Sequence, residues 1–209
     1  MGFDTQRLRD KSEVPTVVMF PARGTPFGRP IPPGTPTEDS DEKSPNRSER
    51  RYSGTMMTKD SVSIRAVKTS DSSQWAELYR GYRAFYELSP DDSIVERVWT
   101  WIHDDSNEVN AFVAISGDRL VGLAHYRRFS RPSTGSVGIY LDDLFTDSTA
   151  RGAGVGRALL SELSALAERE GHSVVRWITA EDNTRARRLY DLTATSTKWV
   201  TYDLAPGAL

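Results

Sequence analysis

A short glycine-rich segment, Arg151-Gly152-Ala153-Gly154-Val155-Gly156-Arg157, is the part of the sequence whose residue types and spacing point most directly to chemistry. It follows an apolar, strand-like run that ends in Asp142-Asp143-Leu144-Phe145-Thr146, and it opens into a helical pattern. Glycines let a ligand approach the backbone closely, and a helix N-terminus presents unpaired N–H groups and a partial positive charge. The flanking arginines can add bidentate contacts to phosphate. The segment therefore predicts a site for a phosphorylated ligand.

The spacing of these glycines separates three kinds of phosphate-binding loop. The P-loop ends in Gly-Lys-Ser/Thr, which is absent here, and the dinucleotide loop reads Gly-x-Gly-x-x-Gly early in a strand–helix–strand unit. Here the glycines run Gly-x-Gly-x-Gly late in the chain. The pattern Arg-x-x-Gly-x-Gly, which starts at Arg151, resembles the pyrophosphate-binding loop of the GNAT family, the GCN5-related N-acetyltransferases that use acetyl-CoA. A nucleotide-binding protein and a tight turn without ligand stay open as alternatives.

A second motif follows the next strand-like run. Asn183 and Tyr190 are seven residues apart, about two helical turns, so they share a helix face. Ala186 lies between them, and its small side chain leaves room for a ligand to approach that face. With Leu189 they resemble the family's Asn-x-x-Ala-x-x-Leu-Tyr signature. The resemblance covers residues 62–204, and the local sequences are similar to the spermidine/spermine-type and fungal Hpa2-like small-amine acetyltransferases of that family.

The resemblance implies an enzyme that transfers the acetyl group of acetyl-CoA to a primary amine by direct attack in a ternary complex. The glycine loop would hold the pyrophosphate, the N–H of Phe145 would polarise the thioester carbonyl, and Tyr190 would protonate the departing thiolate. The residues implied for the cofactor are Leu144, Phe145, Thr146, Arg151, Gly152, Ala153, Gly154, Val155, Gly156, Arg157 and Asn183. The alternatives are a core tyrosine at Tyr190, a helix cap at Asn183 and a catalytically silent acyl-CoA-binding module.

Two adjacent aspartates, Asp142 and Asp143, are the candidates for the proton acceptor that an ammonium substrate needs. The resemblance implies that Asp142 is the general base, acting through a water. Regular strand alternation predicts that the two side chains lie on opposite faces of the sheet, so that only one faces the active site, and the sequence does not decide which. Two structural aspartates at a strand bulge are the alternative.

The amino-acid composition excludes several kinds of reactive site and gives no reason to expect certain partners. The chain has no cysteine, which excludes disulfides, zinc–thiolate sites and a route through acetyl-cysteine. A net charge of −2 gives no reason to expect nucleic acid, and no apolar run approaches the roughly 20 residues of a membrane span. His103, His125 and His172 lack metal-ligand spacing, so we expect no metal and assign them to surface or core. We expect a cytoplasmic protein whose acceptor is a small-molecule or peptide amine, with no membrane partner; the resemblance also allows a homodimer.

The helices and strands that must position these residues begin at Ser61, where the residue pattern becomes typical of a globular domain. Apolar periodicity predicts strand 62–67, helices 70–86 and 90–102, strands 111–115, 120–128 and 137–145, helix 155–171, strand 174–179, helix 183–193 and strand 198–204. Three consecutive strands predict an antiparallel meander, and the strand–helix–strand unit after them predicts a parallel pair. The predicted fold class is α/β (α+β), a GNAT-like mixed, mostly antiparallel sheet with helices on both faces, in the order β-α-α-β-β-β-α-β-α-β.

The two ends of the chain carry separate predictions. Eight of the eleven prolines fall within the first 45 residues, and such a segment buries too little apolar surface to offset its ordering entropy. We therefore predict a disordered tail over residues 1–60 and an N-acetyltransferase domain over residues 61–209, with Met56 or Met57 as alternative translation starts. Near the other end, Ala194 stands where the family usually has glycine, so we expect the preceding helix to end without a left-handed cap.

Overall fold

A computed structural model describes residues 61–208 of the chain. The predicted tail over residues 1–60, with its alternative starts at Met56 and Met57, lies outside the described residues. The described chain divides into two compact units, residues 61–178 and residues 179–208, and each is described by itself. No helix in this part of the chain is both long and apolar enough to cross a lipid bilayer.

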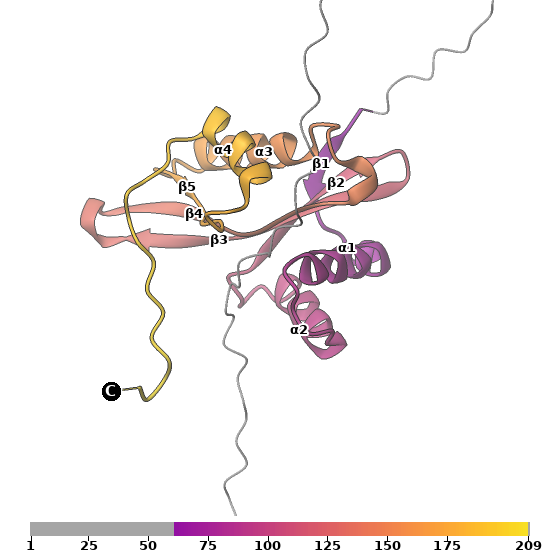
Figure 1. Cartoon of the computed structure of the whole chain (residues 1–209), viewed down its shortest axis with the longest axis horizontal. Helices are drawn as coiled ribbons and strands as arrows, with labels where there is room; N and C mark the ends of the chain where they lie inside the picture. Colours follow the sequence, from indigo (N-terminus) through magenta and orange to yellow (C-terminus); the bar gives the residue numbers. More distant parts are fainter. Residues whose placement is uncertain (1–60, 209) are drawn as a thin grey trace, which may run out of the picture. The chain divides into compact units, whose positions relative to one another are not determined.

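The first unit is built on a five-stranded sheet whose spatial order follows the sequence (Figure 1). Neighbouring strands β1 to β4 pair antiparallel, and β4 and β5 pair in parallel, as predicted. The strands are β1 (Ser63–Ala66), β2 (Asn110–Ser116), β3 (Arg119–Arg131), β4 (Ser136–Thr146) and β5 (Val175–Arg176). Left-handed glycines allow both tight connections of the meander, Gly117 between β2 and β3 and Gly135 between β3 and β4.

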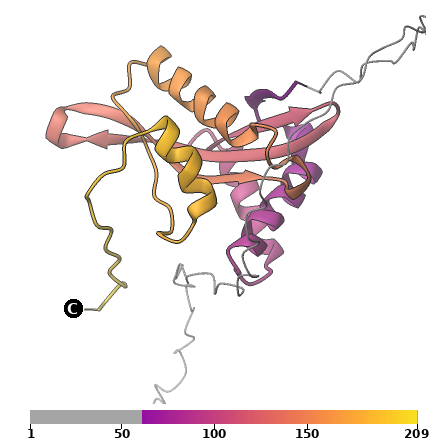
Figure 2. The same ribbon diagram turned by 45° about the horizontal axis from the view of Figure 1, so that its top comes forward.

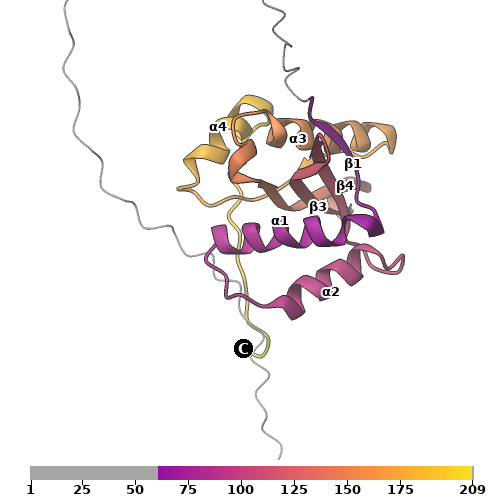
Figure 3. The same ribbon diagram turned by 90° about the vertical axis from the view of Figure 1, so that its right-hand side faces the viewer.

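Helices cover both faces of this sheet, as the sequence predicted. α1 (Ser72–Phe85) and α2 (Asp92–Ile102) lie on one face, where α1 packs on β3 and β4 (Figure 3). α3 (Val155–Arg169) crosses the opposite face, packed on the first four strands (Figure 2). In the parallel β4–α3–β5 connection, the segment that contains the glycine loop joins the end of β4 to the start of α3.

The core lies on both sides of the sheet. On the α1 side Trp75, Val113 and Leu123 are fully buried, and on the α3 side Leu159 and Leu163 are fully buried. Each large apolar side chain removed from water in this way stabilises the fold by roughly 1.5–3 kcal/mol. The α3 stripe repeats at three- and four-residue spacing, which is why its period was readable from the sequence.

Two predictions for the last part of the chain are wrong or incomplete. β5 contains only two residues of the predicted strand 174–179, and residues 198–204 form no strand. A strand needs a backbone partner, which an apolar pattern cannot show. Trp199, Val200, Tyr202 and Leu204 are correspondingly exposed.

The unit of residues 179–208 contains one helix, α4 (Thr184–Thr193). Its end agrees with the prediction made from Ala194, which has φ −147° and ψ 170°, an extended rather than a left-handed conformation. The backbone N–H of Ala194 donates to the carbonyl of Tyr190 and so closes the last turn.

Candidate active site

The glycine loop between β4 and α3 has the geometry of an open anion cradle. Gly152 (φ 86°) and Gly154 (φ 85°) are both left-handed, a conformation that L side chains adopt at a cost. No heavy atom lies within 4 Å of the position that a Cβ would take on either glycine, so the space over the loop is free. Asp147 fixes the entry to the loop, because its carboxylate accepts from the N–H of Thr149 at 2.8 Å.

The start of α3 adds unpaired donors to this cradle. Gly154 is the N-cap and has no side chain that could cap the helix, so the first N–H groups of α3 remain available to an external acceptor. Val155 anchors the same turn in the core at 2% exposure. Arg151 and Arg157 are exposed, and the Arg151 guanidinium lies 5.8 Å from the centre of the Phe85 ring. Donors, free space and two cations fit the pyrophosphate of acetyl-CoA.

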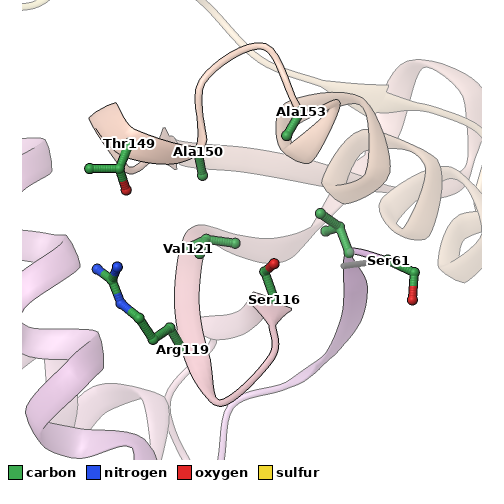
Figure 4. A pocket seen from close by; sticks show the side chains of 8 residues that line it. Ser61, Ser116, Arg119, Val121, Thr149, Ala150 and Ala153 are labelled. Carbon is green, nitrogen blue, oxygen red and sulfur yellow. The ribbon is translucent and has the colours of Figure 1, made fainter. Parts of the chain in front are cut away.

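A pocket of about 510 Å³ opens beside the loop (Figure 4). Thr149, Ala150 and Ala153 of the loop region lie across it from the adjoining ends of β2 and β3, and Arg119, the first residue of β3, is its charged lining residue. The remaining lining residues are Ser61, Val62, Ser116 and Val121. The loop therefore has free space on this side as well as above its glycines.

The last residues of β4 have one paired edge and one open edge. β5 pairs with β4 only at Ile139 and Tyr140, so within residues 61–178 no strand pairs with that edge over residues 141–146. On the other edge the N–H of Asp147 donates to Val121 of β3 at 2.9 Å. Because hydrogen-bonding direction alternates along a strand, the N–H of Phe145 is also directed toward β3. This geometry does not fit the predicted role of the Phe145 N–H, and it directs the N–H groups of Leu144 and Thr146 to the open edge.

A β-bulge at Asp142 corrects the prediction that the two aspartates lie on opposite faces. His125 pairs with Asp143 and Tyr126 pairs with Leu141, which leaves Asp142 as the extra residue. The Asp143 carboxylate contacts His125, and the Asp142 carboxylate contacts Arg127, two residues further along β3. Residues two apart on a strand share a face, so both carboxylates lie on the face that α1 covers.

The two aspartates have different electrostatic surroundings. Asp142 Oδ1 accepts from Arg127 Nε at 3.2 Å, and its side chain is 33% exposed. Burial raises the pKa of Asp142 above the usual aspartate range, against the lowering effect of Arg127. Asp143 Oδ2 lies 2.8 Å from His125 Nδ1, with the side chain 19% exposed. Asp142 thus holds a proton more readily than an ordinary aspartate.

Tyr82 of α1 and Tyr86 at the end of that helix interact with the Asp143 carboxylate. Burial raises the pKa of Tyr82 far above its ordinary value, with further contributions from the charge of Asp143 and a hydrogen bond to it. Burial and then the same charge raise the pKa of Tyr86. Phe145 points to this side too, because its ring lies 3.0 Å from the Cβ position of Gly81 on α1. The tyrosines therefore stay neutral hydroxyls beside the carboxylate.

The predicted site residues of the second unit lie on α4. Asn183 is its N-cap, accepting from the N–H of Ala186 at 3.3 Å and donating to Thr179 at 3.2 Å. Asn183, Ala186, Leu189 and Tyr190 are the half-buried positions among residues 183–190, so they form one stripe of the helix, as predicted. The first unit thus brings together Asp142, Leu144–Thr146 and the glycine loop, while Asn183 and Tyr190 belong to the second unit.

Two residues of this site could not be recognised from the sequence. His125 was assigned to surface or core, and no role was predicted for Trp75. Both are buried, yet His125 bridges Trp75 and the Asp143 carboxylate. Only the register of β3 against β4 places His125 opposite Asp143, and register is set by pairing that a single strand pattern does not reveal.

The first unit combines a mixed sheet, two carboxylates on its fourth strand and a glycine loop that leads into a helix. The comparison with protein families gives the class of protein: the model of the Acetyltransferase (GNAT) family matches residues 75–192, more than half of the chain. The chain belongs to the GNAT family and is an acetyl-CoA-dependent N-acetyltransferase.

Two curated relatives are similar to this chain in sequence, and a solved structure is similar to it in fold. The D-amino-acid N-acetyltransferase HPA3 of Saccharomyces cerevisiae is 28% identical over 70% of this chain and 92% of its own length. The uncharacterized N-acetyltransferase YhfO of Bacillus subtilis is 31% identical over 62% of this chain and 87% of its own. The crystal structure of a ribosomal-protein-alanine N-acetyltransferase from Brucella melitensis has a similar fold, with TM-score 0.59 and 24% identity over 69% of this chain and 99% of that one.

Proposed function

We propose that this protein transfers the acetyl group of acetyl-CoA to a primary amine by direct attack within a ternary complex. The observation that carries the proposal is the bulge of β4, which places two carboxylates on one face, within a few residues of an open strand edge and the glycine loop. A thioester carrier and a protonated amine need these parts: an anion cradle, a backbone edge and a proton acceptor.

The loop and the open edge of β4 are the parts that hold acetyl-CoA in this proposal. Residues Arg151–Arg157 bind the pyrophosphate through backbone N–H groups and the two arginines, and Asn183 adds a polar contact. Leu144 and Thr146 direct their N–H groups to the open edge, where they orient the pantetheine arm and stabilise an oxyanion. Bound there, acetyl-CoA supplies an activated acyl group.

Asp142 is the proposed proton acceptor. An aliphatic amine is mostly protonated at neutral pH and attacks only after it has lost a proton. Asp142 has a raised pKa and a side chain that is one-third exposed, so water can link it to the amine. The Arg127 guanidinium at 3.2 Å stabilises the carboxylate form between turnovers.

Tyr190 is the proposed proton donor for the departing thiolate. A phenol has an ordinary pKa near 10, so Tyr190 carries its proton at neutral pH and can donate it to the thiolate as the thioester bond breaks. The position of Tyr190 on the same α4 stripe as Asn183 supports this role, since the two residues face one side of the helix.

Amine-dependent release of thiol from acetyl-CoA tests the proposal. We would assay polyamines, D- and L-amino acids, aminoglycosides and lysine peptides, and identify each product by its added acetyl group. D-amino acids belong in the panel because HPA3, which is similar to this chain, is named for them. Acetyl transfer to at least one primary amine is expected. Tight acetyl-CoA binding without transfer to any amine would contradict the proposal and favour a silent acyl-CoA-binding module.

A further inference from the structure

A buried hydrogen-bond chain runs from α1 through β3 to β4. The indole Nε1 of Trp75 lies 3.0 Å from Nε2 of His125, and Nδ1 of His125 lies 2.8 Å from Oδ2 of Asp143. An indole N–H can only donate, so Nε2 of His125 must be the acceptor. The proton of the imidazole is therefore on Nδ1, and that N–H donates to Asp143. Trp75 fixes the tautomer of His125.

The hydrogen bonds from Trp75 through His125 to Asp143 fix the charge of the His125 imidazole as well as its orientation. Trp75 is 0% exposed and His125 is 2% exposed, so no water competes for either nitrogen. A second proton on His125 would occupy Nε2 and face the indole N–H, leaving a buried donor without an acceptor. The arrangement is thus that of a neutral imidazole, which orients the Asp143 carboxylate without neutralising its charge.

The other groups around Asp143 do not neutralise it either. It interacts electrostatically with Tyr79 and Tyr82 of α1 and with Tyr86 at the end of that helix, and the pKa values of all three are raised, chiefly by burial. The buried guanidinium of Arg83 on α1 donates to the carbonyl of Ser89 and also interacts with Tyr79. The neighbour of Asp143 on β4 is a second carboxylate, and the nearest cation of β3, Arg127, is bonded to that neighbour. Within residues 61–208 no lysine or arginine forms an ion pair with Asp143.

We propose that Trp75 and His125 are positioning residues that hold the Asp143 carboxylate for the ammonium group of the acceptor. A fixed carboxylate favours aliphatic amines, because an aliphatic amine carries a positive charge at neutral pH. The acceptors of this site are then aliphatic amines that bind as ammonium ions and pass their proton on after binding. This inference rests on the proposed acetyl transfer and adds the chemical class of the acceptor.

A pair of inhibitors that differ only in charge tests the inference. An alkyltrimethylammonium ion and its neutral tert-butyl isostere are measured as competitive inhibitors against an alkylamine acceptor. The intact enzyme is expected to prefer the cation, and Asp143→Asn is expected to lose that preference and to raise the KM of the alkylamine by about ten- to a hundredfold. Unchanged affinity for acetyl-CoA shows that the variant is folded.

Two variants separate positioning from packing. Trp75→Phe removes the N–H that fixes His125. Trp99→Phe changes a ring whose centre lies 4.9 Å from that of Trp75 and leaves the hydrogen bonds of Trp75 and His125 intact. The first is expected to reduce the preference for the cation and the second to preserve it. Equal effects of both variants, or equal binding of the two inhibitors by the intact enzyme, would overturn the inference. Failure of the acetyl transfer itself gives a different result, the absence of amine-dependent thiol release.

Discussion

Gly122 on β3 is the position at which one added methyl group should damage both the fold and the cofactor site. A Cβ there would lie 2.6 Å from Cγ1 of Val155 and 2.9 Å from the carbonyl oxygen of Phe145. Carbon atoms in contact prefer about 3.5–4.0 Å, so the first distance is about 1 Å too short. The second involves backbone, which cannot rotate away. Gly122→Ala must therefore move the start of α3, the end of β4, or both.

The size of the effect follows from this geometry. Overpacking a well-filled core costs about 1–3 kcal/mol, and a clash with backbone places this variant at about 2–3 kcal/mol. For a chain of this size each kcal/mol lowers Tm by about 2–4 °C, so we expect Tm to fall by about 4–12 °C. Val155 belongs to the glycine-rich segment, and Phe145 lies on β4 beside the residues proposed to bind the pantetheine arm, so the affinity for acetyl-CoA should fall too. Differential scanning calorimetry measures the change in Tm, and isothermal titration calorimetry measures the change in affinity for acetyl-CoA.

Gly138→Ala is the matched control. Its Cβ would lie 2.7 Å from the Phe129 ring and 2.9 Å from a methyl group of Val174, both in side chains, toward the far end of β4. These side chains can shift, so we expect a loss of about 1 kcal/mol and unchanged affinity for acetyl-CoA. If Gly122→Ala leaves both Tm and affinity unchanged, or if Gly138→Ala weakens acetyl-CoA binding equally, the reasoning from close approach is refuted.

Three further predictions concern other elements. Two hydrogen bonds from Arg65 lower the pKa of buried Asp71, so the Asp71 carboxylate stabilises the fold above its unfolded pKa and loses that contribution as pH falls through the lower folded pKa. The difference in unfolding free energy between the intact protein and Asp71→Asn should therefore shrink with acidification, and a constant difference would contradict this. Ala194→Gly should destabilise by about 0.4–1 kcal/mol in urea unfolding, because the position is extended, and a gain would show a left-handed cap. Tyr190→Phe should lower turnover by about a hundredfold or more with unchanged acetyl-CoA affinity, and unchanged turnover would remove Tyr190 from the mechanism.

The sequence predicted the elements whose signals are local. The apolar period of α3 is an example, because it is carried by residues three and four apart on one helix. The glycine loop belongs to this group, because its conformation depends on Gly152 and Gly154 themselves. The antiparallel meander and the parallel β4–β5 pair followed from the order of these elements.

The remaining features depend on pairing between distant segments. The bulge at Asp142 exists only in the register of β3 against β4, and it moves both aspartates to one face where alternation would separate them. The same register brings His125 to Asp143, and α1 then supplies Trp75 from fifty residues away. The strand predicted over residues 198–204 is absent because an apolar pattern does not guarantee a partner.

Initial rates with acetyl-CoA and amine both varied, together with the mass of the enzyme during turnover, test the central claim most directly. Direct attack in a ternary complex predicts intersecting lines in double-reciprocal plots, no acetyl group on the protein and an amine product that has gained one. Parallel lines with an acetylated enzyme would contradict it, because they would require a covalent intermediate on a chain that has no cysteine to carry one.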